Sequence, residues 1–150
     1  GIPALFRLNG TSDIDFSEIY RARPESQFYD YSKELSRVRK NNLTNYDLTF
    51  SGSMYSTQSR AALKKAVKSG YRIAVAFNTK NIASDTLQVS SSMASFDKTD
   101  LRHLDGNVIG SLTRKGSNKA ERAAEDKNEN SFFITTANLK QFNNIIAIGG

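Results

Sequence analysis

The sequence contains no cysteine, one histidine and two prolines. The absence of cysteine excludes disulfides, cysteine zinc sites and thiol catalysis within these 150 residues. Because His103 is the single histidine, a metal site with several histidine ligands is also excluded within one chain. No apolar run approaches the roughly 20 residues that a membrane span needs, and no secretory apolar segment opens the sequence. These absences predict a cytoplasmic protein with no membrane partner.

What is present is a globular composition with an uneven charge. Hydrophobic residues make up 38% and charged residues 24% of the chain, whose length fits one domain with a sizeable core. Residues 1–80 hold 13 lysines and arginines against 7 acidic residues, whereas residues 81–150 hold 8 of each. A basic half favours a polyanionic partner, because binding to phosphates releases counterions. A solvated basic surface is the other interpretation.

The first half alternates between two hydrophobic patterns. Strand patterns are expected at residues 4–9, 27–32, 45–51 and 71–78. Helices are expected at residues 13–24, 33–42 and 56–70. Strands that alternate with helices favour right-handed crossovers and parallel pairing. We therefore predict an α/β fold with a mainly parallel sheet and βαβ crossovers, either a doubly wound sandwich or a partial barrel, in a single domain over residues 1–150.

Local signals refine this pattern and extend it to the second half. Asp15 and Glu18 have the spacing of a capping box, and Gly70 is placed to end the third helix. Residues 86–96 are serine-rich and fit a strand or a loop. Beyond them, strands are expected at 107–112, 131–136 and 145–150, and helices at 120–127 and 137–144. The mixed charges and turn residues of 111–130 predict a mobile loop segment.

Polar residues follow all four strands of the first half. In parallel α/β sheets, ligands bind beyond the carboxyl ends of the strands, so these residues could converge: Asn9, Thr11, Ser12, Asp13, Tyr31, Ser32, Lys33, Ser51, Ser53, Asn78 and Thr79. Lys33 could hold a phosphate or carboxylate as a point charge, or be an exposed residue at the start of a helix. Asp13 could bind a cation, act as a base or cap its own turn.

A second polar cluster comprises Asp97, Asp100, Arg102, His103 and Asp105. Three carboxylates at this spacing could hold a divalent metal through oxygen ligands. The spacing does not match an EF-hand loop, so the metal and any cofactor stay unknown. We expect Asp97, Asp100 and Arg102 to lie near Asp13 and Lys33, and Asp13, Lys33, Asp100 and Arg102 to be the catalytic residues of one pocket at the strand ends.

The basic residues form helical stripes that suit phosphate contacts. Lys33, Arg37 and Lys40 are expected on one helix face, and Arg60, Lys64 and Lys68 on another. Lys115 belongs to a glycine-containing basic loop, "RKGSNK", that matches no phosphate-loop motif. Tyr29 and Tyr31 either stack on bases or pack in the core.

Two blocks resemble a known family. "FRLNGTSDI", "FYDYSK", "NYDLTFSGS" and "IAVAFN" resemble a family of bacteriophage and plasmid proteins with an FYDYTK-like strand motif. That family's D-x-x-D-x-R block corresponds to Asp97, Asp100 and Arg102, and its lysine-glycine turn to Lys115 and Gly116. The resemblance implies a phage or mobile-element origin and therefore a location in the cytoplasm of a host cell. It implies no particular reaction.

Many relatives in that family begin with a cysteine-rich segment before the first strand. This chain opens almost directly on the strand, so we expect either a shorter branch or a fragment of a longer protein. A metal or iron–sulfur role of those cysteines is not carried over to this sequence.

Three functions remain open on the sequence. The first is an accessory protein that binds or acts on nucleic acid through its basic first half. The second is an enzyme that acts on a small phosphorylated or carboxylated molecule at the strand ends. The third is an inhibitor that binds a host protein without catalysis. The sequence does not decide whether the protein is an enzyme, nor its oligomeric state.

Overall fold

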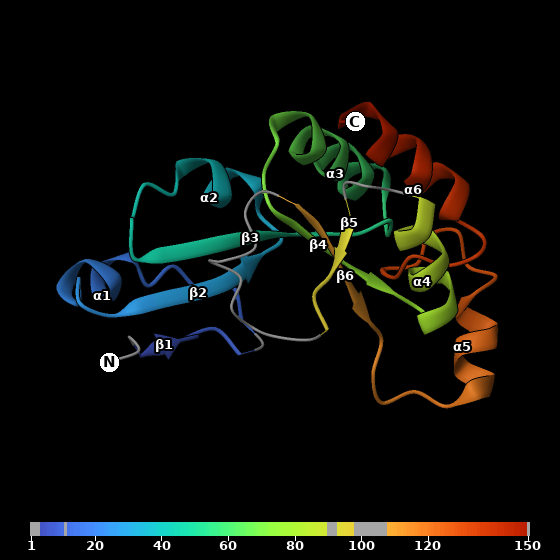
Figure 1. Ribbon diagram of the computed structural model, residues 1–150, viewed down its shortest axis with the longest axis horizontal. Helices are drawn as coiled ribbons and strands as arrows, with labels where there is room; N and C mark the ends of the chain where they lie inside the picture. The colour runs from blue at the N-terminus through green and yellow to red at the C-terminus, as the bar shows by residue number, and fades with distance from the viewer. Residues whose placement is uncertain (1–3, 11, 90–92, 98–107, 150) are drawn as a thin grey trace.

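The computed structural model describes residues 4–10, 12–89, 93–97 and 108–149. Within them, one open sheet of six strands runs in the order β1-β2-β3-β4-β6-β5, and every pairing is parallel (Figure 1). The predicted α/β fold with a parallel sheet is confirmed. The sheet ends at β1 and β5 and does not close into a barrel. The strands are Leu5–Phe6 (β1), Gln27–Ser32 (β2), Tyr46–Gly52 (β3), Ile73–Phe77 (β4), Met93–Ser95 (β5) and Ile109–Thr113 (β6).

Helices alternate with the strands as the crossover pattern requires. In the described residues the α-helices are Ser17–Ala22 (α1), Leu35–Lys40 (α2), Thr57–Ser69 (α3), Lys80–Val89 (α4), Lys119–Glu125 (α5) and Leu139–Ile146 (α6), and a 3-10 helix follows at Ala147–Gly149. Helix α3 is capped at both ends, and its last residue is followed by Gly70 as the sequence predicted. The Ser56 hydroxyl accepts a hydrogen bond from the Ser59 amide at 3.0 Å, and Gly70 ends the helix in the left-handed conformation with φ 69°.

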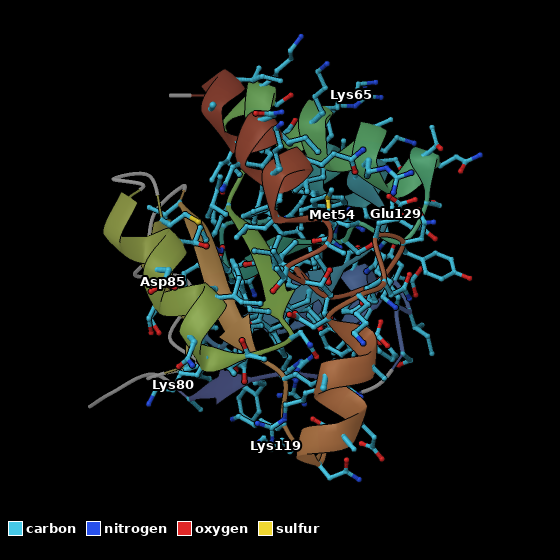
Figure 2. All side chains as sticks on the ribbon, turned by 90° about the vertical axis from the view of Figure 1, so that its right-hand side faces the viewer. Met54, Lys65, Lys80, Asp85, Lys119 and Glu129 are labelled. Atoms are coloured by element: carbon cyan, nitrogen blue, oxygen red, sulfur yellow. The ribbon has the colours of Figure 1, made fainter. Side chains whose placement is uncertain are left out.

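The hydrophobic core lies on one face of the sheet. Alternate strand residues, including Phe28, Leu48, Phe50 and Val75, join buried residues of α1, α2, α3, α4 and α6 in one cluster. At Gly52 an added Cβ would lie 2.7 Å from the Leu63 Cδ1, so glycine lets α3 approach β3 closely. Met54, which follows β3, is fully buried in this core, and Figure 2 places it close to α3.

Two strands predicted near the C-terminus are wrong. In the segment 131–136, Ile134 makes an isolated bridge to Phe77. Side chains hold the rest as turns: the Ser131 hydroxyl accepts from the Phe133 amide at 3.0 Å. The segment 145–150 is helical as far as Gly149. Phe142 and Ile146 are spaced by one helical turn, and both are buried in the core.

Three further expectations differ from the structure. Helix α4 occupies residues that were unassigned or fitted a strand or loop. The capping box at Asp15 and Glu18 is wrong, because Phe16 is the N-cap of α1 and the Asp15 carboxylate instead accepts from the Ser17 amide at 2.9 Å. The segment 111–130 contains the end of β6 and all of α5, with a capping box at Asn118 and Glu121. Its mobility stays a prediction.

Asp126 secures the turn that leads to α6. Its carboxylate accepts hydrogen bonds from the Thr136 amide at 3.0 Å and from the Thr136 hydroxyl. Burial raises the pKa of Asp126, but the hydrogen bonds from Thr136 and Asn78 outweigh this, and the pKa is lowered from its ordinary value. The charged carboxylate therefore stabilises the fold above the unfolded-state pKa of about 3.9, and this contribution is lost as the pH falls through the folded pKa.

We expect Asp126→Ala to lower the free energy of unfolding at pH 7 by about 1–3 kcal/mol, the cost of losing hydrogen bonds to a charged group. The difference from the unmodified protein should begin to shrink as the pH falls below the unfolded-state pKa of about 3.9, because the folded-state pKa is lowered. Thermal melts of both proteins at pH 7 and pH 3 measure this. A difference that is the same at the two pH values would contradict the role of the charge.

Candidate functional site

Two cavities open at the carboxyl ends of β1, β2 and β3. The first has a volume of about 250 Å³ and is lined by Arg7, Gly10, Ser12, Asp13, Tyr31, Lys33 and Ser51. The second has a volume of about 150 Å³ and shares Lys33 and Ser51 with the first; its other lining residues are Phe50, Ser53, Tyr55, Ser59, Ala62 and Phe132. Because the two cavities share lining residues, we treat them as one strand-edge groove. It brings together the polar ends of three of the four strands that were expected to converge, whereas Asn78, after β4, is buried and donates to the Arg122 carbonyl at 2.7 Å instead.

Lys33 stands at the junction of the two cavities. Helix α2 begins at Leu35, so Lys33 precedes the helix and does not share its basic stripe. The Lys33 Nζ lies 5.1 Å from the centre of the Phe132 ring, a distance that suits a cation–π contact. The side chain is exposed and makes no ion pair with the described residues. This position leaves its ammonium able to meet an anion in the groove.

Asp13 is anchored by three partners. One carboxylate oxygen accepts from the Ser32 hydroxyl at 2.8 Å and from the Lys33 amide at 3.1 Å, and the other pairs with the Arg37 guanidinium. The loop before it is tied by Asn9, whose side-chain amide donates to the Ile14 carbonyl at 2.8 Å. Asp13 therefore fastens the loop after β1 to the start of α2, and its catalytic role stays a prediction.

Asp97, the one residue of the second polar cluster that the structure describes, does not line the strand-edge groove. Asp97 accepts hydrogen bonds from the amide and hydroxyl of Thr113 at 3.1 and 2.8 Å, so it lies at the end of β6. Strands β3 and β4 separate β6 from β2, which carries Lys33 at its end. The expectation that Asp97 lies near Asp13 is wrong. Asp100, Arg102, His103 and Asp105 lie outside the described residues.

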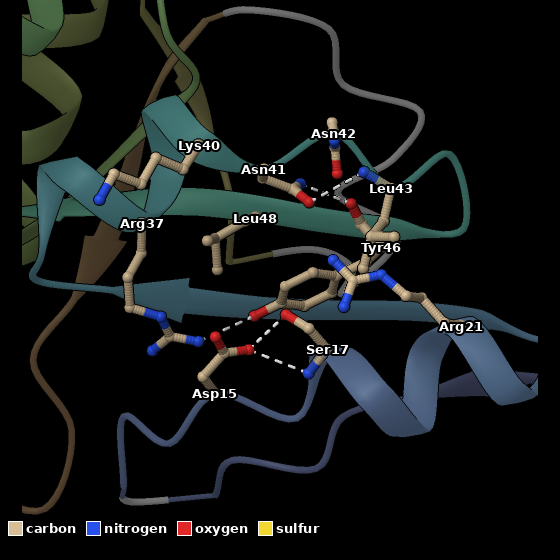
Figure 3. A pocket seen from close by; sticks show the side chains of 10 residues that line it. All are labelled: Asp15, Ser17, Arg21, Arg37, Lys40, Asn41, Asn42, Leu43, Tyr46 and Leu48. Carbon is tan, nitrogen blue, oxygen red and sulfur yellow. Dashed lines mark hydrogen bonds between the residues drawn. The ribbon is translucent and has the colours of Figure 1, made fainter.

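A third cavity, with basic walls, lies between α1 and α2. This helix groove has a volume of about 210 Å³, and Arg21, Arg37 and Lys40 line it together with Asn41 and Asn42 (Figure 3). Tyr46 lies at its base in the close-up, and the Arg37 guanidinium is 3.5 Å from the Tyr46 hydroxyl. Burial and the neighbouring Tyr20 raise the pKa of Tyr46, so the phenol stays neutral.

Asp15 is the acidic residue in the wall of the helix groove. Hydrogen bonds from the hydroxyl and amide of Ser17 hold the pKa of Asp15 below its ordinary value, so this carboxylate is charged at neutral pH. Three basic side chains thus face one carboxylate among the described lining residues, and the groove keeps a positive excess. Such a cavity suits an anion.

Exposed cations continue from this groove along α2 and α3. We call Arg39, Lys40, Lys64, Lys65 and Lys68 the basic helix face. All five side chains are exposed, neither helix contains an acidic residue, and none of the five forms an ion pair with the described residues. Both helices pack on β3, so they are neighbours on the core side of the sheet (Figure 1).

The chain matches a known family model over most of its length. The model described as Gene product 88 matches residues 1–129. The chain belongs to the gene product 88 family. This phage-type family agrees with the resemblance to bacteriophage proteins seen in the sequence. No curated protein and no solved structure matches the chain, so the function of this gene product 88 family member has to follow from its geometry.

In this gene product 88 family member, the residues predicted to bind nucleic acid divide into groups. Lys40, Lys64 and Lys68 lie on the basic helix face, whereas the Arg60 guanidinium donates internally to the Met54 carbonyl at 2.8 Å and to the Asn130 side chain at 3.1 Å. Arg37 is held by Asp13 and lines the helix groove. Lys115 is exposed on the turn after β6, beside Gly116 with φ 73°, and lies on neither helix.

Tyr29 and Tyr31 point away from the core. In the parallel register they alternate with Phe28 and Asp30, and neither belongs to the core cluster. The Arg7 guanidinium lies 5.0 Å from the centre of the Tyr31 ring. The two tyrosines therefore lie on the sheet face opposite α2 and α3, away from the basic helix face, and their stacking on bases stays a prediction.

Several residues of these grooves were missed by sequence reasoning. Arg7, Tyr55 and Phe132 line the strand-edge groove from segments far apart in the sequence. On the basic helix face, Arg39 and Lys65 were also missed, because they lie off the regular i, i+4 stripes, yet both are exposed.

Among the described residues, no three histidine, cysteine, aspartate or glutamate side chains are grouped to hold a metal ion. In the same parts of the chain, no helix has the length and apolar character needed to cross a bilayer.

Proposed function

We propose that this protein binds nucleic acid through the basic helix face. The observation that carries the proposal is the set of five exposed cations on two neighbouring helices that contain no acidic residue. Lysine and arginine side chains in such an arrangement contact phosphates and release condensed counterions. The surface is charged rather than apolar, whereas a host-protein inhibitor would need an apolar interface core.

The helix groove extends this surface toward α1. Lys40 belongs to both features, and Arg21 and Asn42 line the same cavity. Amide and guanidinium donors around a cavity suit a phosphate oxygen. Contacts of this kind position a nucleic acid backbone and carry no sequence information directly. The proposed binding is therefore to the phosphate backbone, with little dependence on base sequence.

Replacing Lys64, Lys65 and Lys68 together by alanine should weaken binding to a duplex DNA and flatten its salt dependence. Each lost phosphate contact lowers the slope of log affinity against log salt concentration by about 1, so the triple variant should be shallower by about 3. Fluorescence polarisation of a labelled duplex at several salt concentrations measures the slope.

The matched control replaces Lys80, Lys119 and Lys127 by alanine, which removes the same charge from exposed positions on or next to α4 and α5. Lys80 and Lys119 lie at the opposite end of the molecule from Lys65 (Figure 2). The control should keep the original slope. The proposal would be contradicted by a lack of binding at low salt, by an affinity for the duplex that does not change with salt concentration, or by equal slopes for the two triple variants.

A further inference from the structure

The strand-edge groove has the composition of a site for a small phosphorylated ligand, and it lies apart from the basic helix face. Lys33 and Arg7 supply positive charge. The Arg7 guanidinium is partly committed, because its Nε lies 3.4 Å from the Asp30 carboxylate. Lys33 has no such partner among the described residues, so its ammonium is the principal anion-binding group.

The carboxylate in the groove does not oppose an anion strongly. Asp13 is the acidic residue among the described lining residues. Its charge is already compensated by the Arg37 guanidinium and by hydrogen bonds from Ser32 and Lys33. A carboxylate with its oxygens occupied in this way leaves the field of Lys33 acting on the cavity.

Hydroxyl donors line the groove next to Lys33. Ser51 and Ser53 are half-buried at the end of β3, and their hydroxyls make no hydrogen bond within the described residues. Unpaired hydroxyls that face a cavity can donate to phosphate oxygens without displacing an internal partner. Lys33 together with these serines can surround a phosphate from two strand ends.

An aromatic wall completes the second cavity. The Tyr55 side chain is 65% exposed, although it lines this cavity. The Phe132 ring is held edge-on against Phe133, with ring centres 5.5 Å apart, and it also meets the Lys33 ammonium. One exposed ring, Tyr55, and one half-buried ring, Phe132, beside a phosphate-binding cation suit a planar base, because a base can stack on an aromatic face.

We propose that the strand-edge groove binds a nucleoside phosphate, with the phosphate at Lys33 and the base against Tyr55 and Phe132. The site follows the rule that ligands of parallel sheets bind beyond the carboxyl ends of the strands. It is independent of the proposed nucleic acid surface, because none of its cations belongs to the basic helix face.

The test is isothermal titration of the full chain with adenosine 5′-monophosphate, adenosine and inorganic phosphate. Adenosine 5′-monophosphate should bind more tightly than either of its parts. Lys33→Ala should weaken its binding by about tenfold or more, the loss expected for a charge-assisted contact, and should leave adenosine binding unchanged. Tyr55→Ala should weaken adenosine 5′-monophosphate but not inorganic phosphate.

Lys65→Ala, on the basic helix face, is the control and should bind adenosine 5′-monophosphate as the unmodified protein does. Lys33→Ala should keep the melting temperature and the salt slope of duplex binding, which separates failure of this site from failure of the nucleic acid surface. Competition by a 5′-phosphorylated oligonucleotide, but not by its 5′-hydroxyl form, would identify a strand end as the source of the same group. The proposal is overturned if millimolar adenosine 5′-monophosphate does not bind, if it binds no more tightly than phosphate, or if Lys33→Ala has no effect.

Discussion

Replacing Phe77 by alanine is expected to lower the free energy of unfolding by about 3–5 kcal/mol, the range for removing a buried phenylalanine. Phe77 is fully buried at the end of β4. Its ring meets the Phe142 ring edge-on with centres 5.7 Å apart, and its backbone bridges to Ile134. One residue thus joins the sheet, α6 and the segment before α6, and the cavity left by alanine would lie among all three.

Chemical denaturation of the Phe77→Ala variant at neutral pH measures this loss. Tyr55→Ala is the matched control, because it also removes an aromatic ring but from a side chain that is 65% exposed. The control should change stability by no more than about 0.5 kcal/mol. Equal losses in the two variants would mean that the Phe77 ring is not packed as the structure shows.

Replacing Gly110 by alanine should also destabilise the protein strongly. An added Cβ would lie 1.9 Å from the Cδ2 atom of the Phe96 ring, far inside van der Waals contact. The ring packs over Gly110 on the sheet face opposite the main core, since Phe96 does not belong to the core cluster. Overpacking of this kind typically costs about 1–3 kcal/mol and occasionally more.

Gly10→Ala provides the control for the loss of glycine itself. Nothing lies within 4 Å of a Cβ added at Gly10, and its φ is not positive, so stability should hold or rise slightly. The double variant Phe96→Ala with Gly110→Ala should be no less stable than Phe96→Ala alone, because the clash is then gone. Additive losses in the double variant would show that Gly110 is required for another reason.

Local sequence signals predicted the elements whose pattern and packing agree. The six residues of β2 were predicted with their bounds, because aromatic side chains with strand preference also alternate between a buried and a half-buried face. Helix α3 was predicted from its apolar stripe and from Gly70, a local end signal that needs no tertiary information.

Two kinds of contact overrode the strand preference near the C-terminus. Residues 131–136 favour a strand by composition, yet Asn138 accepts from the Thr135 amide at 2.9 Å and holds the segment in a turn. Ile145 and Ile146 favour a strand by their branching, but they continue the face of α6 that packs on the core. In the first segment local side-chain hydrogen bonds decided the conformation, and in the second packing against core residues distant in sequence did; strand propensity contains neither.

The strand-edge groove was predictable only in part. The rule for parallel sheets brought Ser12, Lys33 and Ser51 to one edge from the sequence alone. It could not predict Phe132 as a lining residue, because that residue reaches the groove from outside the strands. Nor could it show that the Asp13 carboxylate is paired with the Arg37 guanidinium. Side-chain partners are set by packing between elements, and spacing along the chain does not determine them.

The strand order β1-β2-β3-β4-β6-β5 bears on how the chain folds during synthesis. A chain that leaves the ribosome from its N-terminus can pair β2 with β1, β3 with β2 and β4 with β3 as each strand emerges. Strand β5 differs, because its partner in the described sheet is β6, which is made after it. A nascent chain arrested before Ile109 should therefore hold four paired strands and leave Met93–Ser95 unprotected from hydrogen exchange, until β6 docks between β4 and β5.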